Sequence, residues 1–406
     1  MPPADHLTDD SPRDGGPALP LGPAGAATAG TPYRVLARKY RPVRLDDLVG
    51  QEAMVRTLLN AFASGRVAHA FILTGVRGVG KTTTARIIAR GLNCTGADGS
   101  GGPTPNPCGV CESCRAIAED RHVDVIEMDA ASRTGVDDIR ELIDSVRYRP
   151  VSARYKVYIV DEVHMLSRAA FNALLKTLEE PPPHVKFVFA TTEIRKVPVT
   201  VLSRCQRFDL RRLDAETLAR HFARIAEAEG VAISAEALAL IARAADGSVR
   251  DGLSLLDQAM ALAEGERGAA EVRAMLGLVD RSQLFDLVDA VAAADAKGAL
   301  DRFGAMYEAG ADPLSALQDL LDLIHWVTRL KLVPEIADSP VVSELERVRG
   351  RALAERLSMG DLSRAWQMLL KGIAEVQMAP APVHAAEMVL VRLAYASGLP
   401  RVSNTH

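Results

Sequence analysis

The residues with the clearest chemical potential form a glycine-rich segment, Gly75-Val76-Arg77-Gly78-Val79-Gly80-Lys81-Thr82, which Thr83 follows. This spacing is typical of a phosphate-binding loop, in which backbone N–H groups surround an anion and the lysine reaches the β- and γ-phosphates. The Thr82 hydroxyl is then placed to bind magnesium. An apolar run precedes the loop and a helical pattern follows it. Because a helix N-terminus also favours anions, this order predicts a nucleotide site rather than a structural glycine turn.

Two adjacent acids, Asp161 and Glu162, end the apolar run 158–160. Neighbouring residues on a strand point to opposite sides, so the two carboxylates can do different jobs. Asp161 would hold the magnesium shared with Thr82, and Glu162 would polarise the attacking water. The alternative is a solvated acidic turn, and the phosphate loop upstream favours the metal-binding interpretation.

Four of the five cysteines have a spacing typical of a metal site, and the loop before the last three is rich in glycine and proline. Four thiolates suit a closed tetrahedral zinc site of structural type. Two disulfides and an iron–sulfur cluster are the alternatives, and a cytoplasmic thiol pool disfavours the disulfides. We expect the fifth, Cys205, to be a buried apolar residue. The predicted zinc ligands are Cys94, Cys108, Cys111 and Cys114.

Further polar residues follow the apolar run 187–190. Thr191 and Thr192 would lie at the same sheet edge as Asp161, where their hydroxyls could sense the γ-phosphate or position water. Arg204 comes shortly afterwards. The residues alone do not distinguish a surface arginine from one that enters a neighbour's site.

The elements that must position these groups are predicted by hydrophobic patterns. From Tyr33 to about Arg211, short apolar runs alternate with helical patterns, which indicates a parallel sheet covered by helices on both faces. A helix is expected from Ser167, as its N-cap, to Glu180, before three prolines. The clearest strands are 71–73, 123–128, 157–160 and 185–190.

After Arg212 the pattern is helical throughout. Helices are expected over 214–229, 234–245 and 248–263, and a capping box that begins at Ser248 places Arg250 in the first turn of the last one. A further helical block begins near Leu278 and suits packing or oligomerisation. Its two expected apolar faces are Leu284, Leu287, Val288 and Val291, and Leu314, Leu317, Leu321 and Ile324.

Composition limits the class of protein. The 406 residues suit two or three domains, and 48% of them are apolar. The net charge of −4 gives no global attraction to nucleic acid, so any DNA contact must be local or shared with partners. The first 31 residues are expected to be disordered, and no secretory signal or membrane helix is predicted, which favours the cytoplasm.

Together these motifs resemble the bacterial DNA polymerase III gamma/tau clamp-loader subunits over Tyr33 to about Gly277. The motifs that carry the resemblance are the phosphate loop, the four-cysteine insert, Ala37-Arg38-Lys39-Tyr40-Arg41-Pro42, Val49-Gly50-Gln51, Asp129-Ala130-Ala131-Ser132-Arg133, Asp161-Glu162-Val163-His164-Met165-Leu166, Leu175-Lys176-Thr177-Leu178-Glu179-Glu180-Pro181-Pro182, Ser203-Arg204-Cys205 and Gly247-Ser248-Val249-Arg250-Asp251.

The resemblance implies an α/β AAA+ ATPase domain with a zinc-binding insert, a helical lid and an all-α collar. The implied boundaries are 1–31 for the extension, 32–211 for the ATPase domain with its insert at 94–114, 212–277 for the lid and 278–400 for the collar.

Carried over by position, the resemblance also assigns roles to single residues. Lys81 and Thr82 bind phosphate and magnesium, Asp161 and Glu162 form the second nucleotide motif, and Thr191 or Thr192 is the first sensor, with Thr192 preferred. The remaining implied roles are a finger into the adjacent subunit's site for Arg204, a lid sensor for Arg250, adenine contacts for Tyr40, Arg41, Pro42 and Val49, and a position facing DNA for Arg133.

The implied function is that of an ATP-driven motor subunit, part of the DNA-directed DNA polymerase holoenzyme. It would assemble with delta, delta-prime and further gamma/tau copies into a pentamer that loads a sliding clamp onto primer-template DNA, at the replisome on the nucleoid. The end at His406 resembles the short form or a truncated copy, without a polymerase or helicase tether. The alternatives are a catalytically silent scaffold like delta-prime, which the intact nucleotide motifs disfavour, and a branch-migration motor, which the cysteine insert disfavours.

Overall fold

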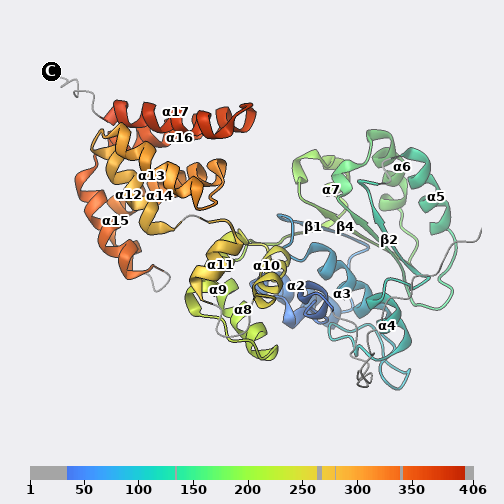
Figure 1. Cartoon of the computed structure of the whole chain (residues 1–406). Coiled ribbons are helices and arrows are strands. Elements are labelled where there is room, and N and C mark those ends of the chain that lie inside the picture. Colours follow the sequence, from blue (N-terminus) through green and yellow to red (C-terminus); the bar gives the residue numbers. More distant parts are fainter. Residues whose placement is uncertain (1–33, 133–134, 263–267, 279, 339–341, 398–406) are drawn as a thin grey trace, which may run out of the picture.

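The computed structural model describes residues 34–132, 135–262, 268–278, 280–338 and 342–397. Within them, a sheet covered by helices is followed by a small helical group and then a larger one (Figure 1). This arrangement confirms the expected fold class. The predictions for the first 31 residues, for Arg133 and for the end at His406 concern positions outside the described residues.

The described strands form one five-stranded sheet in the order β2-β3-β4-β1-β5, with every neighbouring pair parallel. Leu73 of β1 lies opposite Ala190 of β4, and Val160 of β3 lies opposite Phe189 of β4. The carboxyl ends of β1, β3 and β4 therefore meet at one edge. The strands are β1 (Ala70–Thr74), β2 (Val125–Asp129), β3 (Lys156–Asp161), β4 (Val185–Thr191) and β5 (Gln206–Asp209).

The four expected strands are confirmed with two corrections. β2 begins at Val125 rather than Val123, because the Asp124 carboxylate is buried and accepts hydrogen bonds from three backbone N–H groups of the loop 151–153. The edge strand β5 was not predicted, and only Phe208 of its four residues is buried.

Both faces of the sheet are buried, as the apolar runs predict. In β1, Phe71 and Leu73 pack with the cluster formed by α2 and α3, whereas Ala70 and Ile72 pack with the cluster formed by α5 and α6. The helix α6 begins after its N-cap Ser167, as expected. The helices and 3₁₀ turns of this part are α1 (Leu36–Lys39), η1 (Leu45–Asp47), α2 (Glu52–Ala63), α3 (Lys81–Asn93), α4 (Glu112–Ala118), α5 (Val136–Val146), η2 (Val163–Met165), α6 (Arg168–Glu179), η3 (Ile194–Lys196) and α7 (Val199–Leu202).

The small helical group, which we call the lid, packs around its own apolar cluster, which also includes Leu36 from α1, before the first strand. The backbone N–H of Leu36 donates to Asp257 in α10 at 3.3 Å, so this N-terminal turn lies on the lid helices rather than on the sheet. The three helices expected here are confirmed. The group contains α8 (Ala215–Ala228), α9 (Ala235–Ala244), α10 (Val249–Met260) and α11 (Ala269–Met275).

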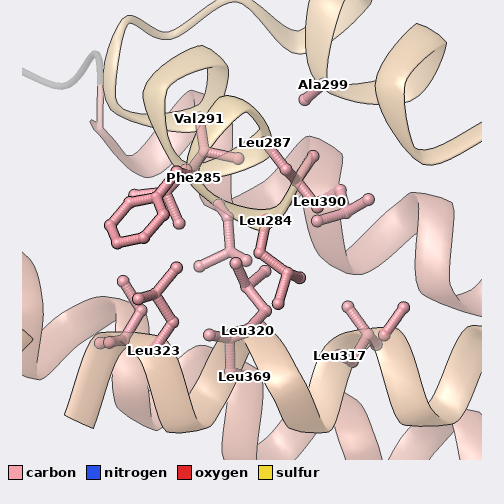
Figure 2. Close-up of a cluster of buried hydrophobic side chains, with 14 of the residues drawn as sticks. Leu284, Phe285, Leu287, Val291, Ala299, Leu317, Leu320, Leu323, Leu369 and Leu390 are labelled. Carbon is pink, nitrogen blue, oxygen red and sulfur yellow. The ribbon is translucent and has the colours of Figure 1, made fainter. Parts of the chain in front are cut away.

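The larger helical group, which we call the collar, contains a third core. Figure 2 shows Leu284 of α12 directed toward Leu320 of α14, and Leu287 of α12 beside Leu390 of α17. No helix among the described residues is long and apolar enough to cross a membrane. The collar elements are α12 (Arg281–Ala292), α13 (Ala296–Glu308), α14 (Pro313–Leu332), η4 (Pro334–Asp338), α15 (Glu344–Arg356), α16 (Met359–Met378) and α17 (Pro382–Ser397).

Candidate nucleotide and metal sites

The predicted phosphate loop connects β1 to α3 at the carboxyl edge of the sheet. Its glycines Gly75, Gly78 and Gly80 all have positive φ angles, of 151°, 77° and 103°. A Cβ on Gly75 would lie 2.7 Å from the carbonyl oxygen of Leu210, so a side chain has no room there. The loop conformation therefore depends on glycine at these positions.

Lys81 lies inside this loop, with only 5% of its side chain exposed. Its Nζ donates to the carbonyl oxygens of Gly75 at 3.0 Å and Val76 at 3.1 Å. Burial lowers the pKa of the Lys81 ammonium, and the nearby carboxylates of Glu162 and Asp161 partly oppose this. A buried cation that donates to carbonyl oxygens, with the Glu162 carboxylate 4.0 Å away, is suited to an exchange of those carbonyl partners for phosphate oxygens.

The two predicted magnesium ligands are brought together from different elements. Thr82, in the first turn of α3, donates from Oγ1 to Oδ2 of Asp161, at the end of β3, over 2.6 Å. The other oxygen of Asp161, Oδ1, accepts the backbone N–H of Glu162 at 2.9 Å. A hydroxyl and a carboxylate side by side are a suitable donor set for a hard divalent cation.

Glu162 occupies a strained position immediately after β3. Its φ of 45° and ψ of 44° are left-handed, which costs a non-glycine residue on the order of 1–2 kcal/mol. Its Oε2 accepts the backbone N–H and the Oγ1–H of Thr192, at 3.1 and 3.0 Å. Thr191 is fully buried, and its Oγ1 contacts His164. Of the two threonines, Thr192 is therefore the one that lies against Glu162.

The lid contacts the phosphate loop directly at Gly78. The backbone N–H of Arg250 donates to the Gly78 carbonyl at 3.3 Å, and a Cβ on Gly78 would lie 1.8 Å from Oγ of Ser248. Ser248 also caps α10 by accepting the backbone N–H of Asp251. Arg250 lies in the first turn of α10, as the sequence predicts.

Three arginines lie beside the phosphate loop, where Arg86 and Arg250 are close enough to Arg41 to interact with it electrostatically. Although part of the Arg41 side chain is exposed, desolvation lowers the pKa of its guanidinium, and the positive charges of Arg86 and Arg250 lower this pKa further. Arg86 is itself paired with Glu127 through two hydrogen bonds of 2.7 and 2.8 Å. This concentration of positive charge favours an anionic ligand.

The segment expected to contact adenine borders a cavity of about 930 Å³ between residues 40–52 and 211–225. Tyr40 and Val49 line this cavity, whereas Arg41 and Pro42 are not among its lining residues. The Tyr40 hydroxyl is hydrogen-bonded to Glu229 of the lid. Because no residue of the phosphate loop lines this cavity, it is not by itself a site for a nucleoside triphosphate.

Arg204 lies just after α7, and its described contacts are not with the phosphate loop. Its guanidinium donates to Oε1 of Glu179 in α6 and to the carbonyl oxygen of Thr200, both at 2.7 Å. About 29% of the side chain remains exposed. None of these contacts joins Arg204 to this chain's own phosphate loop.

The four predicted metal ligands converge. Their sulfur atoms all lie within 4.8 Å of one another, so the cluster could hold a metal ion. All five cysteines are described and free, which does not support the disulfide alternative. The backbone N–H groups that donate to the cluster are those of Gly96 and Cys108 to Cys94, of Cys111 to Cys108 and of Cys114 to Cys111.

The thiols of the cluster differ in acidity. Burial alone would raise the pKa of Cys111, but hydrogen bonds from Thr95 and Cys114 outweigh it and lower that pKa to about 6. Burial raises the pKa of Cys114 to about 12. Cys205 is partly buried rather than buried as expected; it packs against the sheet core, and burial raises its pKa to about 12, which is typical of an unreactive thiol.

The sequence analysis did not assign a role to His164, two residues after Glu162. Its side chain is 6% exposed, and its two ring nitrogens lie near the carboxylates of Glu162 and Glu193. A titratable residue two positions after a pair of adjacent acids is a signal that could have drawn attention to it.

Three family models match parts of this sequence. Residues 50–214 match the delta subunit of DNA polymerase III. Residues 217–265 match the ATPase lid domain of a DNA polymerase III clamp loader subunit, and residues 268–405 match domain III of DNA polymerase III subunits gamma and tau.

Individual proteins are also similar. The chain is 45% identical over 369 residues to DNA polymerase III subunit tau of Escherichia coli, and this match covers 91% of the chain but 56% of that relative. It is 38% identical over 361 residues to DNA polymerase III subunit gamma of Buchnera aphidicola, covering 89% of the chain and 98% of that relative. A solved structure of the RuvB Holliday junction branch migration motor from Thermotoga maritima has a TM-score of 0.43 and 21% identity, covering 62% of this chain and 79% of that one.

Proposed function

This chain belongs to the family of DNA polymerase III gamma and tau subunits, and from this membership we propose that it is an ATP-driven motor subunit of a clamp loader. It would use ATP hydrolysis to open a sliding clamp and load it onto primer-template DNA. Its partners would be delta, delta-prime and further gamma/tau copies in a pentamer, in the cytoplasm at the replisome.

The observation that carries the proposal is the contact between Thr82 and Asp161 beside the buried Lys81. In this proposal the loop from Gly75 to Thr83 surrounds the phosphates of ATP, and Lys81 leaves its carbonyl partners to bind phosphate oxygens. Thr82 and Asp161 hold Mg²⁺, which neutralises the charge that develops on the phosphates.

The remaining site residues complete the chemistry in our proposal. Glu162 orients and polarises the attacking water, and Thr192 holds that carboxylate in place. Arg250 approaches the phosphates from the lid, whose first turn contacts the loop. Arg204 acts in the adjacent subunit's site, a role supported by its position away from this chain's own loop.

We propose a structural zinc ion for the four-cysteine cluster. Four sulfur atoms within 4.8 Å of one another leave no position for a substrate once they close a tetrahedral site. Adenine would lie near the segment that contains Tyr40 and Val49, which α1 holds against the lid.

The function can be tested with Lys81→Ala in the loader reconstituted with the other subunits, a sliding clamp and primed DNA. We expect clamp loading and DNA-stimulated ATP hydrolysis to be lost. Lys297→Ala, at an exposed position in α13, is the matched control and should behave like the wild type. Wild-type loading by the Lys81 variant would support a catalytically silent scaffold instead.

A further inference from the structure

His164 lies in η2, between the carboxyl ends of β3 and β4. Its side chain is almost fully buried, at 6% exposure, although imidazole is a polar group. A polar ring at such a position must find partners for both nitrogens, since an unpaired buried polar atom is costly.

The two ring nitrogens face different carboxylates. Nδ1 lies 3.3 Å from Oε2 of Glu162 and 3.0 Å from Oγ1 of Thr191. Nε2 lies 3.4 Å from Oε1 of Glu193, which follows β4. Thr191 is fully buried in β4 and its Oγ1 also accepts the backbone N–H of Glu193, so the ring is held against a rigid strand end.

The consequence for Glu162 is that its two oxygen atoms have different surroundings. Oε2 accepts two hydrogen bonds from Thr192 and lies next to His164 Nδ1, whereas Oε1 faces the phosphate loop, 4.0 Å from Nζ of Lys81. A carboxylate fixed through one oxygen presents the other in a defined direction. That direction is toward the place where a phosphate would lie.

We infer that His164 is a positioning residue for ATP hydrolysis, acting through Nδ1 on Oε2 of Glu162. This inference rests on the proposed function, in which Glu162 polarises the attacking water. Without the ring, the Glu162 side chain gains freedom to rotate about its own bonds, and a misplacement of about 1 Å can cost on the order of a hundredfold in rate. Nucleotide binding does not depend on this contact, because the loop, Lys81 and Thr82 make no described contact with His164.

Two amide substitutions separate the two ring nitrogens. His164→Asn places an amide group close to the position of Nδ1, beside Glu162, whereas His164→Gln reaches toward the position of Nε2, beside Glu193. His164→Ala removes both ring nitrogens and replaces neither. We expect His164→Ala and His164→Gln to lower the rate of hydrolysis at saturating ATP roughly ten- to a hundredfold, and His164→Asn to recover most of it.

The full-length chain should be assayed within the reconstituted loader, with a fluorescent ATP analogue to measure nucleotide affinity in parallel. Affinity within about twofold of wild type in all three variants is expected. Equal hydrolysis by the Asn and Gln variants would overturn the inference, even if the Ala variant failed to fold. A parallel loss of affinity and hydrolysis in all three variants would also overturn it, because a purely structural role predicts that result.

Glu162→Gln serves as the reference variant. If it retains hydrolysis, the proposed role of Glu162 is wrong, whatever the His164 variants do. If it abolishes hydrolysis while His164→Ala hydrolyses ATP like wild type, only the inference about His164 is wrong.

Discussion

Replacing Gly78 with alanine should weaken nucleotide binding through the contact between the phosphate loop and the lid. At a φ of 77°, an alanine costs about 1–2 kcal/mol relative to an ordinary backbone conformation. Its Cβ would also lie 1.8 Å from Oγ and 3.0 Å from Cβ of Ser248, so the serine must turn away and give up its cap on α10. A lost serine cap costs about 1 kcal/mol.

The two costs add to about 2–3 kcal/mol, which corresponds to roughly 30- to 150-fold weaker binding if the nucleotide requires the present loop and lid. Gly80→Ala is the matched control, because Gly80 has a φ of 103° in the same loop but no atom within 4 Å of an added Cβ. The Gly80→Ala variant should therefore lose only the binding free energy that corresponds to the backbone strain. Titration of the full-length chain with a fluorescent ATP analogue measures both variants.

A double-mutant cycle isolates the clash from the strain. In a Ser248→Ala background the cap is already absent and Oγ is gone, so the Gly78→Ala change should cost about 1 kcal/mol less than in the wild type. Strictly additive effects of the two substitutions would show that the lid does not contact the loop at Gly78 when nucleotide binds. That result would refute the reasoning.

The other predictions concern the metal cluster, the neighbouring site and the collar. The purified chain should contain about one zinc ion, which Cys111→Ser should release and Cys205→Ser should leave in place, as elemental analysis would show. Subunits with Arg204→Ala, mixed with wild-type subunits, should slow hydrolysis in the adjacent site by on the order of 10³ to 10⁵ at unchanged nucleotide affinity; unchanged hydrolysis would exclude the finger role. Glu346→Gln removes the charge of a carboxylate that is 8% exposed and lies between the partly exposed Arg243 and Arg281. Urea unfolding should therefore show a decrease of about 1–3 kcal/mol in the free energy of unfolding. As a control, Glu344→Gln changes a carboxylate that is 74% exposed and should alter the free energy of unfolding by less than about 0.5 kcal/mol. Equal losses in the two variants would argue against a stabilising contact of Glu346 with Arg243 and Arg281.

The features that could be predicted from the sequence are those whose chemistry is local. The phosphate loop has fixed spacing, and the strands β1, β3 and β4 are apolar on both faces because helices cover both. β5 could not be predicted because it is an edge strand in which only Phe208 is buried, so its sequence contains no apolar run. The start of β2 was misplaced because Val123, which is 65% exposed, has the side chain of a strand residue but lies in a turn.

The geometry around Glu162 could not be predicted because it depends on contacts between separate strands. The family resemblance favours Thr192 over Thr191, and the structure supplies the physical reason, because Thr191 is buried at the end of β4 whereas Thr192 donates to Glu162. The left-handed backbone of Glu162 has no sequence signal, because glutamate rarely adopts it. The contact of Arg204 with Glu179 likewise joins residues 25 positions apart.

The lid joins the nucleotide site to the collar through one short segment. Arg243, at the end of α9, lies 3.6 Å from Glu346 of α15, and only five residues later Ser248 packs against Gly78 of the phosphate loop. The turn between them requires glycine, because Gly247 has a φ of 79° and an added Cβ there would lie 2.9 Å from Cβ of Arg212. One short, closely packed segment of the lid therefore links the contact at Gly78 to the ion pair with Glu346.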